Sequence, residues 1–201
     1  MKASIFLILA SFLFTGCNKM AGAIVDQTTS GASSTQFIKY TIQKGNQYCD
    51  GNAFKEIELS EMKFIVRFDS SAIYETRLAG NQYDINKLYG FSDNNAEHHQ
   101  YSARIGWRWS DHALRLFAYV YNEGAVSSKE LTAVAIGAEI NCSIKAAGSN
   151  YLFTINGTTT SMPRLATTEK AKGYQLYPYF GGDEVAPHEI NIWIKPLPLS
   201  P

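Results

Sequence analysis

The side chains best suited to binding chemistry form a group of arginines and aromatic residues between positions 104 and 121. Its members are Arg104, Arg108, Arg115, Phe117, Tyr119 and Tyr121. Guanidinium groups bind carboxylate or sulfate through paired hydrogen bonds, and aromatic rings offer apolar faces to sugar rings. On one shared surface, these side chains would suit an acidic sugar. The alternative stays open that Asp or Glu from a neighbouring strand neutralises the arginines, while the tyrosines merely cover the sheet.

Two predicted strands, residues 102–109 and 113–122, must position this group. The short Asp111-His112 connection between them suits an antiparallel hairpin. If Ser110 faces Ala113, one face becomes continuously apolar, pairing Trp109 with Leu114, Trp107 with Leu116 and Ile105 with Ala118. The other face then pairs Arg108 with Arg115, Gly106 with Phe117, Arg104 with Tyr119 and Ser102 with Tyr121. Because like charges destabilise each other across strands, the Arg108–Arg115 pair predicts a carboxylate neighbour or an anionic ligand.

Other candidates for catalysis or metal binding are weaker. His98 and His99 are adjacent and would point in opposite directions on a strand, and His188 alternates with isoleucines as a residue at the core edge would. The sequence has no carboxylate run of the kind seen in sandwich hydrolases, no nucleophile elbow and no zinc-type Cys or His spacing. We therefore name no catalytic residue and expect no cofactor or metal. Calcium at residues 181–184 is the one exception left open, although a turn explains Gly181-Gly182-Asp183-Glu184 as well.

The N-terminal residues predict export. Lys2 precedes an apolar run, residues 3–14, that is too short to span a bilayer of about 30 Å. We therefore interpret residues 1–16 as a signal peptide. Residues 13–17 resemble the lipobox of bacterial lipoproteins, which implies a diacylated Cys17, although Phe14 is bulkier than usual. A plain secretory peptide remains the alternative. Residues 17–35 have the composition of a flexible stalk, and Asn18 favours the outer membrane by analogy with known sorting signals, with the leaflet undecided.

The remaining cysteines and the overall charge limit the partners. Cys49 and Cys142 could form a disulfide in an oxidising compartment, or could stay as two thiols with Cys142 buried among isoleucines. The chain carries 18 basic and 18 acidic residues. It therefore lacks the excess of basic residues that is typical of a nucleic-acid binder. We expect a membrane as a partner through the lipid anchor, an acidic glycan as a further candidate, and no nucleic acid.

Residues 36–196 predict one all-β domain. Short runs rich in β-branched and aromatic residues recur between turn residues, and no long stretch shows helical periodicity. The predicted strands are 36–43, 62–69, 102–109, 113–122, 131–136, 139–146, 151–155, 158–162, 174–180 and 188–195. Asn156-Gly157 predicts a type I′ hairpin turn. This many strands indicate a two-sheet antiparallel sandwich or jelly roll.

A family resemblance adds to this prediction. Residues 174–192, with the stretches 104–109 and 114–122, resemble uncharacterised surface lipoproteins of Bacteroidota-type bacteria, which in turn resemble concanavalin A-like sandwiches. The resemblance implies that fold and a tendency to bind glycans, and it transfers no catalytic residue. Residues 117–123 also resemble one strand of alginate-lyase sandwiches. The other motifs of those enzymes are missing, so we attribute that similarity to chance.

Three functions are consistent with the sequence. The first is a membrane-anchored, non-catalytic domain that binds a glycan or small ligand through the arginine and tyrosine face. The second is a sandwich-type polysaccharide lyase or glycoside hydrolase, which requires a His or a carboxylate pair on that same face. The third is a structural accessory of an envelope complex, which a flat apolar face would favour.

Overall fold

The computed structural model describes residues 36–198. The predicted signal peptide (1–16), the predicted lipidation site Cys17 and the predicted stalk (17–35) lie outside the described residues. Within the part described, no helix is long and apolar enough to cross a membrane. The predictions about export and anchoring therefore stay predictions.

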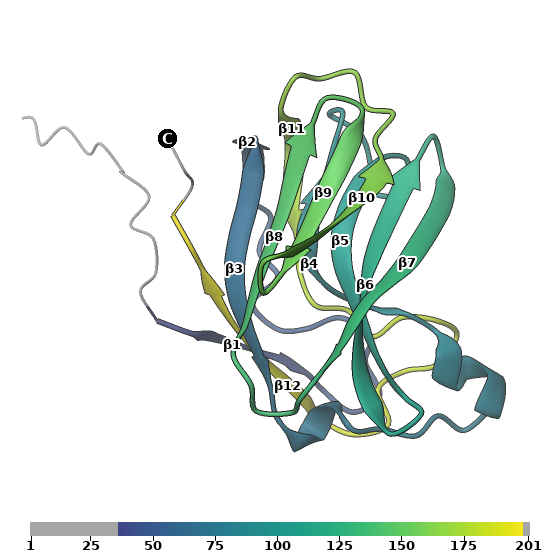
Figure 1. Cartoon of the computed structure of the whole chain (residues 1–201). Helices are drawn as coiled ribbons and strands as arrows, with labels where there is room; N and C mark the ends of the chain where they lie inside the picture. Colours follow the sequence, from purple (N-terminus) through teal and green to yellow (C-terminus); the bar gives the residue numbers. More distant parts are fainter. Residues whose placement is uncertain (1–35, 199–201) are drawn as a thin grey trace, which may run out of the picture. The chain divides into compact units, whose positions relative to one another are not determined.

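Two six-stranded antiparallel sheets make up the described part of the chain (Figure 1). The first has the order β1 (Ile38–Ile42), β12 (Ile190–Pro196), β3 (Glu61–Phe68), β8 (Ile140–Ala147), β9 (Asn150–Ile155) and β10 (Thr158–Pro163). The second has the order β2 (Glu56–Leu59), β11 (Ala171–Leu176), β4 (Asn86–Ser92), β5 (Ser102–Ser110), β6 (Ala113–Asn122) and β7 (Ala125–Val134). Two short 3₁₀ helices, Ser70–Ala72 and Ala79–Tyr83, lie between β3 and β4.

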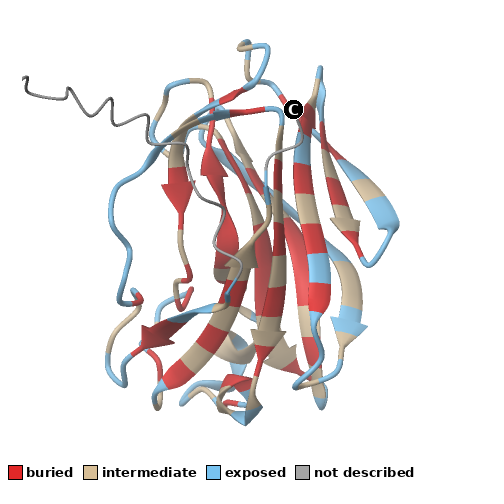
Figure 2. Ribbon diagram, turned by 90° about the vertical axis from the view of Figure 1, so that its left-hand side faces the viewer, coloured by how far each residue is buried: buried red, intermediate tan, exposed pale blue. Residues whose placement is uncertain are grey.

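The core lies between the two sheets, because alternate side chains of each strand point inward. Figure 2 shows the resulting bands of buried and less buried residues along the strands. In β3 the buried positions are Met62, Phe64, Val66 and Phe68, as the sequence pattern predicts. The rings of Phe68 and Trp107 pack 5.3 Å apart and join the sheets. The predicted two-sheet antiparallel sandwich is confirmed.

Both predicted hairpins are confirmed. Strands β5 and β6 pair in the predicted register from Ser102 opposite Tyr121 to Ser110 opposite Ala113. Their connection needs positive φ at both of its residues, and Asp111 and His112 adopt φ values of 51° and 58°. Asn156 and Gly157, at 46° and 86°, turn β9 into β10 in the same way.

Four strands differ from the sequence prediction by more than two residues at an end. Strands β2 and β4 were not predicted, β7 begins at Ala125 instead of residue 131, and β11 covers Ala171–Leu176 instead of 174–180. Strand β4 shows no alternation of buried and exposed residues, and six of its seven residues are buried. Strand β7 is the edge of its sheet and is largely exposed, so it lacks the apolar positions that mark a strand in a sequence.

The candidate disulfide between Cys49 and Cys142 is not formed, because both thiols are free and buried. Cys49 pairs with Ile42 on the outer side of β1, whereas Cys142 lies in β8, three strands further along the same sheet. Four strand spacings amount to about 19 Å, and Cα atoms more than about 7 Å apart cannot be bridged. The alternative of two separate thiols holds.

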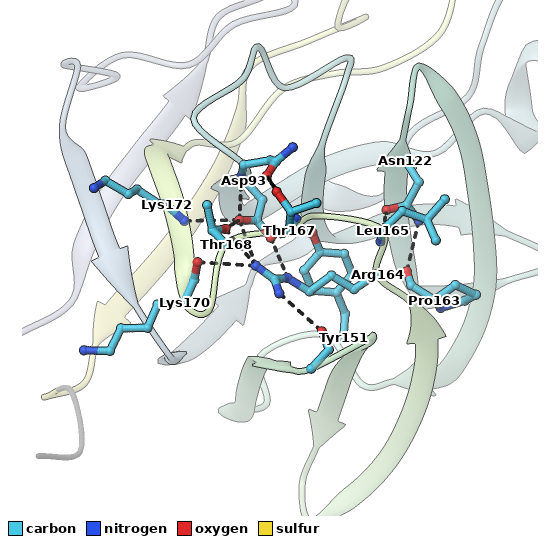
Figure 3. A network of polar contacts seen from close by, with 12 residues as sticks. Asp93, Asn122, Tyr151, Pro163, Arg164, Leu165, Thr167, Thr168, Lys170 and Lys172 are labelled. Carbon is cyan, nitrogen blue, oxygen red and sulfur yellow. Dashed lines mark hydrogen bonds and ion pairs between the residues drawn. The ribbon is translucent and has the colours of Figure 1, made fainter.

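A buried ion pair ties the two sheets together at one end (Figure 3). Asp93 follows β4, and its carboxylate accepts hydrogen bonds from Arg164 Nε at 2.8 Å and from the hydroxyl of Tyr151, in β9, at 2.7 Å. The side chains of Asp93 and Arg164 are 0% and 2% exposed. Burial raises the pKa of Asp93, but the hydrogen bonds from Arg164 and Tyr151 outweigh burial and hold that pKa below its usual value. Because protein groups satisfy this pair, we assign it a structural role.

Candidate functional site

A cavity of about 560 Å³ lies over the face of β4, β5, β6 and β11 that points away from the core. The strands supply its floor, and three connecting segments supply its walls. The lining comprises Tyr48, Asn52, Ala53, Phe54, Lys87, His98, His99, Ser102, Arg104, Tyr119, Tyr121 and residues 174–179. This lining, all of it described, includes no Asp or Glu side chain, so the cavity is cationic.

Arg104 is the central charge of the cavity floor. It lies in β5 between Gly90 of β4 and Tyr119 of β6. Its Nε atom is buried and has no hydrogen-bond partner among the described residues. None of the ion pairs found in residues 36–198 includes its guanidinium. Burial lowers the pKa of Arg104 to about 10, so the side chain is still a cation at neutral pH.

Two further polar groups face the same space. Ser102, two residues before Arg104 on β5, is 1% exposed, and its hydroxyl finds no hydrogen-bond partner among the residues described. Lys87 of β4 places its Nζ 4.7 Å from the ring centre of Tyr119 and donates to the backbone oxygen of Ile85. Burial, with the nearby charge of Arg104, lowers the pKa of Lys87 to about 8. The floor thus holds two cations and an unpaired hydroxyl.

Aromatic rings surround these charges. Tyr119 and Tyr121, whose ring centres are 5.8 Å apart, lie beside Arg104 on β6. Phe54 lies at the mouth with 74% of its surface exposed and its ring 5.6 Å from that of Tyr174, and Tyr48 is 59% exposed. Exposed rings beside a charged floor can stack on a sugar while the charges hold its acid group.

A hydrogen-bonded chain of three side chains lies at one wall, where Tyr174 and His98 line the cavity and Glu97 lies outside the lining. The Tyr174 hydroxyl donates to Glu97 Oε2 at 2.9 Å, and the same hydroxyl lies 3.0 Å from Nδ1 of His98. Burial lowers the pKa of His98 to about 4, and the charges of Arg104 and His99 act in the same direction. His98 is therefore neutral at pH 7. The argument from strand alternation does not apply to His98 and His99, because both lie in a turn, and both line the cavity.

The structure divides the predicted binding residues into two groups. Arg104, Tyr119 and Tyr121 line the cavity. The guanidinium of Arg115 instead pairs with Glu130 of β7 at 2.8 Å and with Asp111 at 3.6 Å. This neutralisation is the alternative that the sequence left open.

Arg108 and Phe117 also lie outside the cavity lining. Arg108 donates to the backbone oxygen of Tyr83 at 2.8 Å and to Ser110 Oγ at 3.1 Å. Its guanidinium covers the Phe117 ring at 4.7 Å. Protein groups thus satisfy two of the three arginines, and only Arg104 faces the cavity without an acceptor.

The chain bends at residues 182–184, and the Glu184 carboxylate is engaged by the protein. It accepts hydrogen bonds from the backbone amides of Arg77 and Leu78 and from the Asn81 side chain. These amide bonds lower the pKa of Glu184. Within residues 36–198, no group of three or more acidic, His or Cys side chains is arranged to hold a metal ion. The calcium alternative for this segment stays a prediction.

Comparison with known proteins assigns the fold. No protein-family model and no curated protein matches this sequence. Among solved structures, the alginate lyase AlyC3 is similar with a TM-score of 0.53 at 6% identity, covering 79% of this chain and 72% of that one. A glycoside hydrolase family 16 endo-glucanase from Bacteroides ovatus gives 0.52 at 14% identity over 80% of both chains. The laminarinase catalytic domain from Thermotoga maritima gives 0.51 at 9% identity over 79% and 75%. The fold is a concanavalin A-like jelly roll.

Proposed function

We propose that this domain binds an anionic saccharide, with the guanidinium of Arg104 holding its acid group. The observation that carries the proposal is a guanidinium that borders a cavity, has a buried Nε without an acceptor, and faces no carboxylate in the lining. An unpaired charge taken out of water is costly unless a counter-ion compensates it. A bound carboxylate or sulfate would supply that compensation and would also reach the ammonium of Lys87.

The shape of the mouth supports a saccharide as the carrier of that anion. Tyr48 and Phe54 expose their rings at the cavity, where an apolar sugar face can stack. Proteins that share the fold include the alginate lyase AlyC3, which has also been determined in complex with dimannuronate, an acidic disaccharide. The outer face is hollowed and charged, so it does not favour the third function, a structural accessory with a flat apolar surface.

Hydrolysis of a glycan is not favoured by the lining. Glycoside hydrolases of the usual type need two carboxyl groups on either side of the scissile bond, about 5 to 10 Å apart. Among the described residues that form the cavity, none carries a carboxylate. The fold is shared with hydrolases, but the pair of groups that performs their chemistry has no counterpart in this cavity.

Calorimetric titration of the purified protein tests the proposal. We expect oligomannuronate to bind and a neutral oligoglucoside of the same length to bind much more weakly. Arg104→Met should weaken oligomannuronate binding about 10- to 100-fold, the value of a charged hydrogen bond. The matched control is Arg108→Met, on the same strand and the same face but outside the lining. Absence of acidic-sugar binding, or equal losses in the two variants, would refute the proposal.

We also propose that the domain is held at the outer membrane by acyl chains on Cys17. The lipobox-like residues 13–17 and the linker composition of residues 18–35 support this anchoring. A tethered binding domain would keep its polymer ligand at the cell surface or within the envelope. The test of the anchor is given in the Discussion.

A further inference from the structure

We propose that the cavity also cleaves uronate polymers by β-elimination, with His98 as the general base and with Glu97 and Tyr174 as positioning residues. This inference rests on the proposed function, because the uronate carboxylate must first bind to Arg104. The substrate class is a polymer of hexuronates linked through O4. The argument uses the hydrogen-bonded wall of the cavity, which saccharide binding alone does not require.

The chain from Glu97 through Tyr174 to His98 determines which nitrogen of His98 can accept a proton. The Tyr174 hydroxyl has one proton, and it donates that proton to Glu97 Oε2 at 2.9 Å. Its oxygen also accepts from the backbone N–H of His98 at 3.1 Å. Nδ1 of His98, 3.0 Å from the same oxygen, must therefore be the protonated nitrogen of the neutral ring. The lone pair of His98 is left on Nε2.

Nε2 of His98 is free to act on a ligand. Across the described residues, no hydrogen bond to this nitrogen is found, and His98 belongs to the cavity lining together with Arg104. The imidazole is neutral in the empty site because burial and the charge of Arg104 disfavour its protonation. A carboxylate bound to Arg104 cancels part of that charge. This loss of repulsion favours the transfer of a proton to His98.

The elimination balances without an oxidant, a metal or water. Arg104 and Lys87 bind the carboxylate and stabilise the negative charge that develops on it, which makes the adjacent C5 proton more acidic. His98 Nε2 accepts that proton, and the electron pair of the C5–H bond becomes the C4=C5 double bond. The bond from C4 to the glycosidic oxygen breaks, and the leaving oxygen takes the hydroxyl proton of Tyr119. The imidazolium returns its proton to the tyrosinate through solvent.

Tyr119 suits the role of the acid in this step. Its ring lies beside Arg104 on the neighbouring strand, and it lines the cavity. Burial raises the pKa of Tyr119, so its hydroxyl carries its proton throughout the neutral range. The products are one chain with a new reducing end and one chain whose terminal sugar contains the double bond. Each product pair is lighter by one water than the pair that hydrolysis would give.

The experiment incubates the full chain separately with polymannuronate, polygalacturonate and hyaluronan. We expect at least one polymer to yield ultraviolet absorbance from the double bond conjugated to the carboxylate, with product masses that match elimination. His98→Asn should lower kcat at least about 100-fold, the usual contribution of a general base, while oligouronate affinity stays within a few-fold. His112→Asn is the matched control, since His112 lies in the exposed β5–β6 turn, and it should leave kcat unchanged.

The positioning residues are tested by a readout that loss of packing would not change. Tyr174→Phe retains the ring but removes the hydroxyl, so it should lower kcat with little change in KM. Nitrogen NMR should show His98 protonated at Nδ1 in the unaltered protein and as a mixture of tautomers in Tyr174→Phe. An unaltered kcat in His98→Asn would overturn the inference.

The experiments distinguish failure of the binding proposal from failure of the cleavage proposal. Oligouronate binding without unsaturated products from any of the three polymers would overturn the elimination and leave the binding function standing. Products with the masses of hydrolysis would overturn it as well. A protein that binds none of the polymers would refute both proposals.

Discussion

Lys87 is the cavity cation whose charge changes most easily with pH. Its pKa is lowered to about 8 because it is buried and lies near Arg104, whose own pKa is about 10. Lys87 is protonated below its pKa and neutral above it, so the affinity for an anionic sugar should fall as pH rises from about 7 to about 9. The fall should be roughly tenfold, the value of one weaker charged hydrogen bond. Calorimetric titration across this range measures it.

The control for this prediction is Lys87→Met, which removes the titrating charge and retains much of the side-chain volume. Its affinity should be lower at neutral pH and almost constant over the same range, since Arg104 stays protonated there. If Lys87→Met keeps the full pH dependence of the unaltered protein, another group is responsible.

The arginines show how far residue types and spacing alone can predict a site. Strand alternation correctly places Arg104, Arg108 and Arg115 on one face, and the like-charge pair correctly demands a counter-charge. The counter-charge of Arg115 comes from Glu130 on β7, a strand whose first half the sequence does not reveal. The acceptor of Arg108 is the backbone oxygen of Tyr83, which no sequence pattern marks. The sequence could therefore identify the face of the sheet that carries the site, but it could not identify Arg104 as the arginine left without an acceptor.

At the scale of elements, the sequence predicts strands that alternate buried and exposed residues and misses strands that lack this alternation. Strand β4 is covered on both sides and contains a bulge between Lys87 and Tyr89, which interrupts the two-residue period. Because β4 is the neighbour of β5, missing it also hides Lys87, the second cation of the cavity. The wall segments 48–54, 98–99 and 177–179 are loops, whose positions depend on packing between residues far apart in the chain.

The Asp93–Arg164 pair is the element-scale contact whose loss should cost most. Arg164→Met removes the cation and leaves Asp93 buried with a charge that only dipoles compensate. Breaking a buried ion pair in this way costs about 3–5 kcal/mol. We expect the free energy of unfolding in urea to fall by that amount at neutral pH. Arg115→Met, which breaks a solvent-screened pair, should lower the free energy of unfolding much less than Arg164→Met.

The pH dependence of stability should change sign in this variant. In the unaltered protein the pKa of Asp93 is lower when folded than when unfolded, so its stabilisation is present above the unfolded pKa of about 4 and is lost as pH falls through the folded value. In Arg164→Met only burial and the remaining hydrogen bonds act on Asp93. Burial raises the folded pKa, so this variant should gain stability as pH falls from about 7 to about 5. A variant that loses stability over this range would contradict the assigned balance.

At the scale of the whole molecule, the jelly roll supplies a rigid floor on which loops can build different sites. The fold is shared with an alginate lyase and with glucan hydrolases at identities of 6% to 14%, so it does not determine the chemistry. The cavity of this chain instead collects residues from positions 48 to 179, around one strand pair that the sequence predicts in full register. The β5–β6 part of the floor was predictable because its contacts are local, whereas β4 and the walls were not, because theirs are distant.

The proposed anchoring of the whole molecule depends on one residue outside the described part of the chain. If Cys17 is diacylated, its chains contribute about 0.8 kcal/mol per buried methylene, enough to hold the protein at a membrane. Expressed in a bacterium that processes lipoproteins, the protein should incorporate labelled palmitate and sediment with outer-membrane vesicles. Cys17→Ser should lose both properties, whereas Cys142→Ala, which removes a buried thiol, should keep them. Export and cleavage of an unlabelled, soluble protein would instead establish the plain secretory peptide, and the saccharide site would then act on ligands free of the membrane.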